Sequence, residues 1–165
     1  DRPADLPAQV MVVVNIPPRK DNALVDLFAR KCRLKVKEAE DKEPLAPGMI
    51  YFAPPDYHLL VETAETLALS SDEAVNHSRP AIDVLFETVA DAFGSALAAI
   101  VLTGANHDGA QGLKAVCEAG GRAFVQDPAT AEVATMPEAA LAACPAALTI
   151  RLDDIPNALQ AMLEE

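Results

Sequence analysis

The strongest constraint on the fold is a series of apolar runs that are too short to be buried helices. The first, at residues 10–14, reads Val-Met-Val-Val-Val. A continuous, branched apolar run of this length predicts a strand that is covered on both faces, which is the environment of a parallel sheet. Further strands are expected at residues 49–53, 98–102 and 122–126. We therefore expect a mostly parallel sheet at the centre of the molecule.

Helical patterns separate these strands. Residues 22–31 carry apolar side chains at helical spacing, and Pro80 starts a second helix that ends near Gly94. The other expected elements are strands at 34–38 and 148–151, a hairpin of 59–62 and 66–70, and helices at 109–119, 129–133, 137–143 and from 153 onward. This alternation predicts an α/β fold: a doubly wound, mostly parallel sheet with helices on both faces and one antiparallel hairpin, in a Rossmann-like arrangement of three layers.

The position of the first strand suggests that this fold is incomplete. Only nine residues precede residue 10, whereas a parallel strand that is covered on both faces needs neighbouring strands and a crossover helix. We expect that a first βα unit is absent, and that residues 1–165 form one N-terminally truncated domain without an internal repeat or a linker.

Composition limits the environment and the partners. Hydrophobic residues make up 51% of the chain, which is enough for a substantial core, and the 25 acidic against 13 basic residues give a net charge of −12 that repels nucleic acid. The sequence contains no apolar stretch of roughly 18 residues and no signal pattern, so we expect a cytoplasmic protein without membrane insertion. Three widely spaced cysteines are expected to be free thiols.

Two loops follow predicted parallel strands, at residues 15–19 and 104–109, and ligands of such sheets collect at the carboxyl ends of the strands. Asp108 opens the next helix. Its position is compatible with an N-cap, whose carboxylate accepts helix amide hydrogens, and with a carboxylate that orients an imidazole in acyl transfer.

The remaining polar side chains give weaker signals. His58 lies where a loop enters a strand and could contact a ligand, whereas His77 and His107 lie in polar loops. Arg79 could bind a carboxylate or form a surface salt bridge. The histidine spacing fits no metal motif, the glycines form no nucleotide-binding pattern, and no serine lies in a G-x-S-x-G elbow.

Several segments, taken together and in order, resemble the catalytic domain of the chemotaxis protein-glutamate methylesterase (CheB-type) family. They are Tyr51-Phe-Ala-Pro-Pro-Asp-Tyr-His-Leu-Leu60, Asn76-His-Ser-Arg-Pro-Ala-Ile-Asp-Val-Leu-Phe86, Leu102-Thr-Gly-Ala-Asn-His-Asp-Gly-Ala110, and Gln126-Asp-Pro-Ala-Thr130 with Met136-Pro-Glu-Ala-Ala140. The resemblance spans essentially the whole chain.

This resemblance implies a carboxylic ester hydrolase with a Ser-His-Asp mechanism that needs no cofactor and no metal. Asp108 matches the acid of the family's triad. The family's histidine, in an H-x-P-P loop, is here Asn15 of Asn15-Ile16-Pro17-Pro18, and the family's serine turn lies upstream of the first strand of this chain. We expect four further residues to contact the substrate: His58, Arg79, Gly104 and Asn106.

The implied substrates are glutamate methyl esters, and certain glutamines, on the cytoplasmic domain of methylated chemoreceptors in bacterial chemotaxis. The family often joins this domain to a phosphorylatable receiver domain. No receiver domain occurs in these 165 residues, so such regulation would come from a separate chain or a missing segment. The alternatives are a catalytically silent binding or regulatory module of the same family, which Asn15 supports, and a small-ligand or nucleotide-binding α/β domain.

Overall fold

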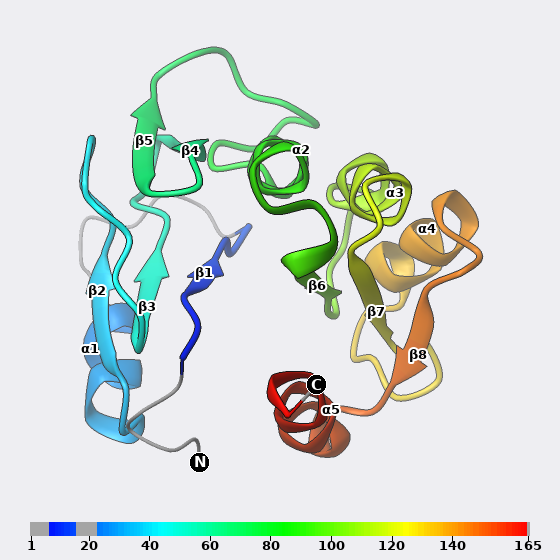
Figure 1. Ribbon diagram of the computed structural model, residues 1–165. Helices are drawn as coiled ribbons and strands as arrows, with labels where there is room; N and C mark the ends of the chain where they lie inside the picture. The colour runs from blue at the N-terminus through cyan, green and yellow to red at the C-terminus, as the bar shows by residue number, and fades with distance from the viewer. Residues whose placement is uncertain (1–6, 16–22, 165) are drawn as a thin grey trace.

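The computed structural model describes residues 7–15 and 23–164, in which strands and helices alternate along the chain (Figure 1). The strands are β1 (Val10–Val12), β2 (Lys35–Glu38), β3 (Met49–Phe52), β4 (His58–Thr63), β5 (Thr66–Ser70), β6 (Ala98–Val101), β7 (Arg122–Gln126) and β8 (Leu148–Ile150). The helices are α1 (Ala23–Lys31), α2 (Ile82–Phe93), α3 (Ala110–Glu118), α4 (Thr135–Ala143) and α5 (Ile155–Leu163), with 3-10 turns at Gly94–Ala96 and Leu152–Asp154.

Outside the hairpin, the named strands of the described residues pair in parallel and form two groups. One sheet has the order β1-β3-β2 and the other has the order β6-β7-β8. Strands β1 and β6 are edge strands of these sheets, and they are the members of the two sheets that lie nearest each other (Figure 1). The predicted parallel α/β fold is confirmed, but its strands form two sheets within the described part of the chain.

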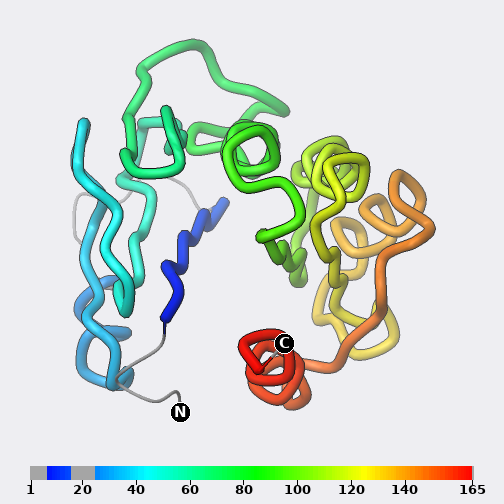
Figure 2. The backbone as a smooth tube through the Cα atoms, in the orientation of Figure 1, coloured from blue at the N-terminus to red at the C-terminus, as the bar shows by residue number. Residues whose placement is uncertain are grey.

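The antiparallel hairpin of β4 and β5 is also confirmed, with His58 opposite Ser70 at one end. Helix α2 packs on β4 and on α3, so it links the two halves of the molecule, as the path of the chain in Figure 2 shows. One apolar core lies beneath the hairpin and α2, with Tyr51, Leu59 and Leu67 at most 1% exposed. Burial of such side chains stabilises each by about 1.5–3 kcal/mol.

The second core lies between the β6-β7-β8 sheet and helices α3 and α4. Leu113 and Val116 of α3 meet Val125 of β7 there, and all three are fully buried. Helix α3 also approaches α2 closely at Gly112, where an added Cβ would lie 2.5 Å from Cβ of Phe86. Only glycine permits this separation, so the α2–α3 contact depends on it.

Two predictions about this half of the molecule are wrong. Residues 129–133 form turns and not a helix, because Asp127 binds the amide of Ala129 through its side chain and that of Thr130 through its backbone carbonyl. Cys117 and Cys144 are joined in a disulfide, leaving only Cys32 free among the described residues. Their separation of 27 residues concealed this pair, because only the packing of α3 against α4 brings the sulfurs together.

The helices are short, and α2 has 12 residues. Among residues 7–15 and 23–164, no helix is both long enough and apolar enough to span a bilayer.

Candidate active site

Asp108 is the centre of the candidate site. It lies in the loop after the carboxyl end of β6 and is 0% exposed. Each carboxylate oxygen accepts two hydrogen bonds. Oδ2 accepts from Nδ2 of Asn15 at 2.8 Å and from the amide of Ile82 at 2.6 Å. Oδ1 accepts from Nδ2 of Asn76 at 2.9 Å and from the amide of Asp83 at 3.1 Å. All four of these donors are neutral N–H groups, and together they satisfy both oxygens of the buried carboxylate.

Asp108 caps a helix, but not the helix that it precedes. Its two backbone donors, Ile82 and Asp83, are the first residues of α2. The amides of Gly109 and Gly112 at the start of α3 instead bind Oδ1 of Asp83, at 3.0 and 2.7 Å. Each aspartate therefore caps the other's helix, because the two helix starts lie side by side and each carboxylate reaches across the contact.

Asn15 follows β1 and joins that strand to the Asp108 loop. Because a carboxylate oxygen bonded in this way acts as an acceptor, the bond to Asp108 fixes the amide group of Asn15 with Nδ2 toward the carboxylate. The other atom of that amide, Oδ1, is buried and has no hydrogen-bond partner among the described residues. An amide donates to the aspartate as an imidazole N–H does, but it offers no basic nitrogen. The rest of the predicted loop, residues 16–19, lies outside the described residues.

Sequence reasoning did not single out Asn76 or Asp83, although both lie in a segment that carries the family resemblance. Nδ2 of Asn76 donates to Oδ2 of Asp83 at 2.7 Å and to Oδ1 of Asp108 at 2.9 Å. Asp83 is only 5% exposed. An aspartate within the otherwise apolar, buried face of the predicted helix was the one available signal, since an aspartate is rarely buried unless it is bonded.

His58 lies at the start of β4 and is 2% exposed. Its Nε2 is 2.8 Å from the carbonyl oxygen of Glu73, to which it donates, and its Nδ1 accepts from the amide of Ala81 at 3.2 Å. Both ring nitrogens therefore bind the backbone, and the ring holds two loops together. The other two histidines, His77 and His107, are not buried.

Arg79 is engaged in a similar way. Its Nε and Nη2 donate to Oδ1 of Asp56 at 3.1 and 2.7 Å, and its Nη1 donates to the carbonyl oxygens of Ser71 and Asp72. A ligand that bound this guanidinium would have to compete with the carboxylate of Asp56.

The loop that carries Asp108 contains the other two predicted contact residues. The amide of Gly104 donates to the carbonyl oxygen of Val133 at 3.2 Å, and its carbonyl accepts from the amide of Met136 at 3.0 Å, so the loop is tied to the start of α4. Oδ1 of Asn106 accepts from the amide of Asp108 at 2.9 Å and shapes the turn into α3. The structure thus brings Asn106 and Asn15 to Asp108, but joins neither His58 nor Arg79 to it.

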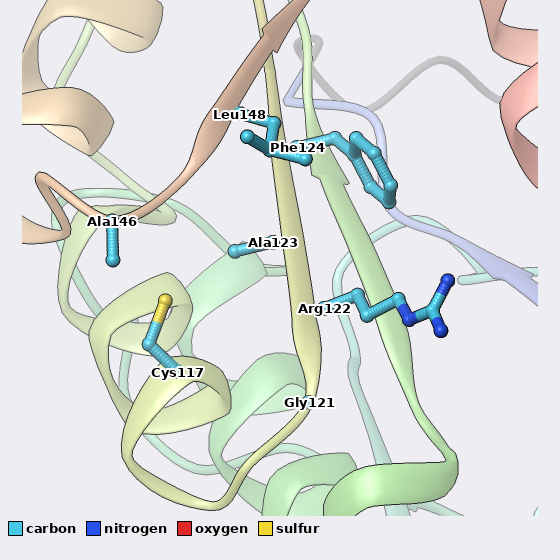
Figure 3. A pocket seen from close by; sticks show the side chains of 7 residues that line it. All are labelled: Cys117, Gly121, Arg122, Ala123, Phe124, Ala146 and Leu148. Atoms are coloured by element: carbon cyan, nitrogen blue, oxygen red, sulfur yellow. The ribbon is translucent and has the colours of Figure 1, made fainter.

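A cavity of about 430 Å³ lies elsewhere (Figure 3). Its walls come from the end of α3 and the beginnings of β7 and β8, so it opens at the amino edge of that sheet, opposite Asp108. The side chains of Arg122 and Phe124 lie on one side of β7, and those of Ala123 and Cys117 lie on the other. The walls are formed by Cys117, Gly121, Arg122, Ala123, Phe124, Ala146 and Leu148.

Metal binding finds no support in the described residues, which contain no group of three or more histidine, cysteine or acidic side chains arranged to hold an ion.

One acidic side chain at the carboxyl edge of the first sheet has a shifted pKa. Burial raises the pKa of Glu38, at the end of β2, above its ordinary value of 4.5.

The fold and this geometry define a class: a parallel α/β domain with a buried carboxylate at the carboxyl edge of its sheet, where enzymes of this architecture place their catalytic groups. The family model described as CheB methylesterase matches residues 1–159. The chain belongs to the CheB methylesterase family, whose activity is that of a carboxylic ester hydrolase.

Named relatives and a solved structure agree with this assignment. A putative protein-glutamate methylesterase/protein-glutamine glutaminase of Leptospira interrogans is 46% identical over 93% of this chain and 79% of that protein. A protein of Symbiobacterium thermophilum named protein-glutamate methylesterase/protein-glutamine glutaminase is 37% identical over 82% of this chain, which is 37% of its own length. The crystal structure of the Thermotoga maritima CheB methylesterase catalytic domain matches with a TM-score of 0.89 and 31% identity, covering 98% of this chain and 86% of that one.

Proposed function

We propose that this chain supplies the acid half of a protein-glutamate methylesterase site that acts on the cytoplasmic domain of methylated chemoreceptors. The observation that carries the proposal is the buried carboxylate of Asp108, which presents Oδ2 to the side chain of residue 15 at 2.8 Å. A triad aspartate holds its neighbouring base in this way. The reaction would release methanol from a glutamyl methyl ester, or ammonia from a glutamine, without a cofactor.

Asn15 limits what this chain can do by itself. An amide cannot accept a proton from a hydroxyl group at neutral pH, so the base of the reaction must be another group. His58 is buried with both ring nitrogens bonded to the backbone. Among the described residues, no serine hydroxyl is bonded to Asn15 or Asp108.

A second candidate function is receptor recognition without hydrolysis. The bond between Asn15 and Asp108 favours it, because the asparagine preserves the contact of the aspartate while removing the basic nitrogen. A protein of this kind would bind the methylated receptor segment and leave the ester intact. Either function would be exercised in the cytoplasm, where that receptor domain lies.

We also infer that a further parallel strand belongs between β1 and β6. Within residues 7–15 and 23–164, each of these strands pairs on one side only, and the bond between Asn15 and Asp108 joins the segments that follow them. An unpaired strand edge leaves backbone donors and acceptors without partners. A βα unit outside these 165 residues would supply this strand and the serine turn.

The test is methanol release from methylated receptor cytoplasmic fragments by the full-length protein, compared with its Asn15→His variant. The matched control is Asn157→His, which places the same ring at an exposed position of α5. Activity in the Asn15→His variant alone means that the site is an intact esterase silenced at the base. Activity in the parent means that another base serves. If neither protein releases methanol but both bind the receptor fragment, recognition is the function, and absence of both activities refutes the proposal.

A further inference from the structure

The buried polar cluster around Asp108 contains two further polar residues, Asn76 and Asp83, that are bonded to Asp108 and to each other. Asn76 lies in a two-residue turn, because the backbones of Val75 and Ser78 exchange hydrogen bonds at 3.0 and 2.9 Å. Both central residues, Asn76 and His77, have positive φ, at 53° and 62°. Asparagine adopts this conformation more readily than most residues, and the short turn leaves its side chain little freedom.

The hydrogen bonds of Asn76 account for both protons on its nitrogen. One is donated to Asp83 and the other to Asp108, and the two acceptors are 5% and 0% exposed. Two carboxylates that share one nitrogen repel each other when both are charged. Their relative position is therefore sensitive to the loss of that shared donor.

Asp83 controls the backbone that carries Asp108. Its Oδ1 binds the amide of Gly109, the residue directly after Asp108, and the amide of Gly112 one turn further on. Its Oδ2 accepts a hydrogen bond from Nδ2 of Asn76. A shift of Asp83 would consequently move both the turn at Gly109 and the side chain of Asn76.

We propose that Asn76 and Asp83 are positioning residues for Asp108: Asn76 occupies Oδ1 and Asp83 fixes the following turn, so that Oδ2 faces the side chain of residue 15. This inference rests on the proposed role of Asp108 as the acid of the site. A purely structural role in capping α2 and α3 would stabilise the fold without affecting the bond between Asp108 and Asn15.

The test measures that bond directly, by NMR, as the solvent exchange of the Asn15 side-chain amide protons. The two variants are Asn76→Ala, which removes the shared donor, and Asp83→Asn. The second is isosteric and retains an oxygen for the α3 amides, but it turns an amide nitrogen toward the nitrogen of Asn76. Asp91→Asn removes the same charge from an exposed position of α2 and is the matched control.

We expect exchange of the Asn15 amide protons to accelerate about tenfold or more in both variants and to stay at the parental rate in the control. Unchanged exchange in the variants, with only the thermal midpoint lowered, overturns the proposal in favour of simple capping. If Asn76→Ala does not fold, Asp83→Asn decides the question. The parent gives a further measurement: both side-chain protons of Asn76 should be protected, and a fast-exchanging pair contradicts the proposal.

This measurement needs no substrate, so it can fail or succeed independently of methanol release. If the Asn15→His protein is active, adding either substitution to it should also lower kcat by about 100-fold while KM changes less than about twofold, because the acid is misplaced and the receptor-binding surface is not. A loss of kcat/KM that came instead from a higher KM would indicate that the two residues act in substrate binding and not in positioning Asp108.

Discussion

The close contact between α2 and α3 leads to a quantitative prediction for Gly112→Ala. The new Cβ would lie 2.5 Å from Cβ of Phe86 and 3.1 Å from both the Cα and the Oδ1 of Asp83. Cβ of Phe86 and Cα of Asp83 are held rigidly by the backbone of α2, so they cannot move away unless the helix itself shifts. Overpacking of this kind costs about 1–3 kcal/mol.

The same substitution weakens a hydrogen bond. The amide of Gly112 donates to Oδ1 of Asp83 at 2.7 Å, and separation of the helices would lengthen this bond to a buried carboxylate, which is worth about 1.5–3 kcal/mol. Alanine favours the helix over glycine by about 1 kcal/mol, which offsets part of the loss. We expect a net loss of about 1.5 kcal/mol or more, with about 5 kcal/mol as the upper limit, in the free energy of unfolding.

Urea denaturation followed by circular dichroism measures this loss. With a slope of about 2 kcal/mol per molar, the midpoint should fall by about 1 M or more. The neighbouring Gln111→Ala at an exposed position of α3 is the control, and its midpoint should stay within a few tenths molar of the parent. A Gly112→Ala protein as stable as the parent, or more stable, would refute the reasoning, because helix propensity alone would then decide the outcome.

Two further predictions concern pH and redox conditions. Burial raises the pKa of Glu38, so the stability that its carboxyl group contributes is present below the ordinary pKa of 4.5 and is lost as pH rises through the folded-state pKa. Glu38→Gln should therefore raise the denaturation midpoint at pH 7 and leave it unchanged at pH 4. A gain of equal size at both pH values would contradict this. The Cys117–Cys144 disulfide joins residues that are 27 positions apart, so adding a reductant should lower the unfolding free energy by about 3.5 kcal/mol, and Cys117→Ser should remove that response. A reductant effect that persists in this variant would exclude the bridge as its cause.

The hydrophobic periodicity of the sequence predicted most of the strands and helices and the α/β fold class. The apolar runs at residues 10–14 and 98–102 contain the strands β1 and β6, because a short run that is apolar on both faces has few environments other than a parallel sheet. The same reasoning placed Asp108 after the carboxyl end of a strand. It failed at residues 129–133, where side-chain and backbone bonds from Asp127 hold turns.

The sequence by itself therefore determined the fold class, the family and the place of Asp108 after the carboxyl end of a strand, together with the absence of a histidine at residue 15. The tertiary structure alone decided which atoms meet. Asn76 and Asp83 reach the site from 32 and 25 positions away along the chain, and His58 is buried with both ring nitrogens occupied. Within residues 7–15 and 23–164, the parallel strands form two sheets. Hydrophobic periodicity reports which face of an element is buried, but it carries no information about the distant partner, and only the packing of α2 against α3 brings the two aspartates together.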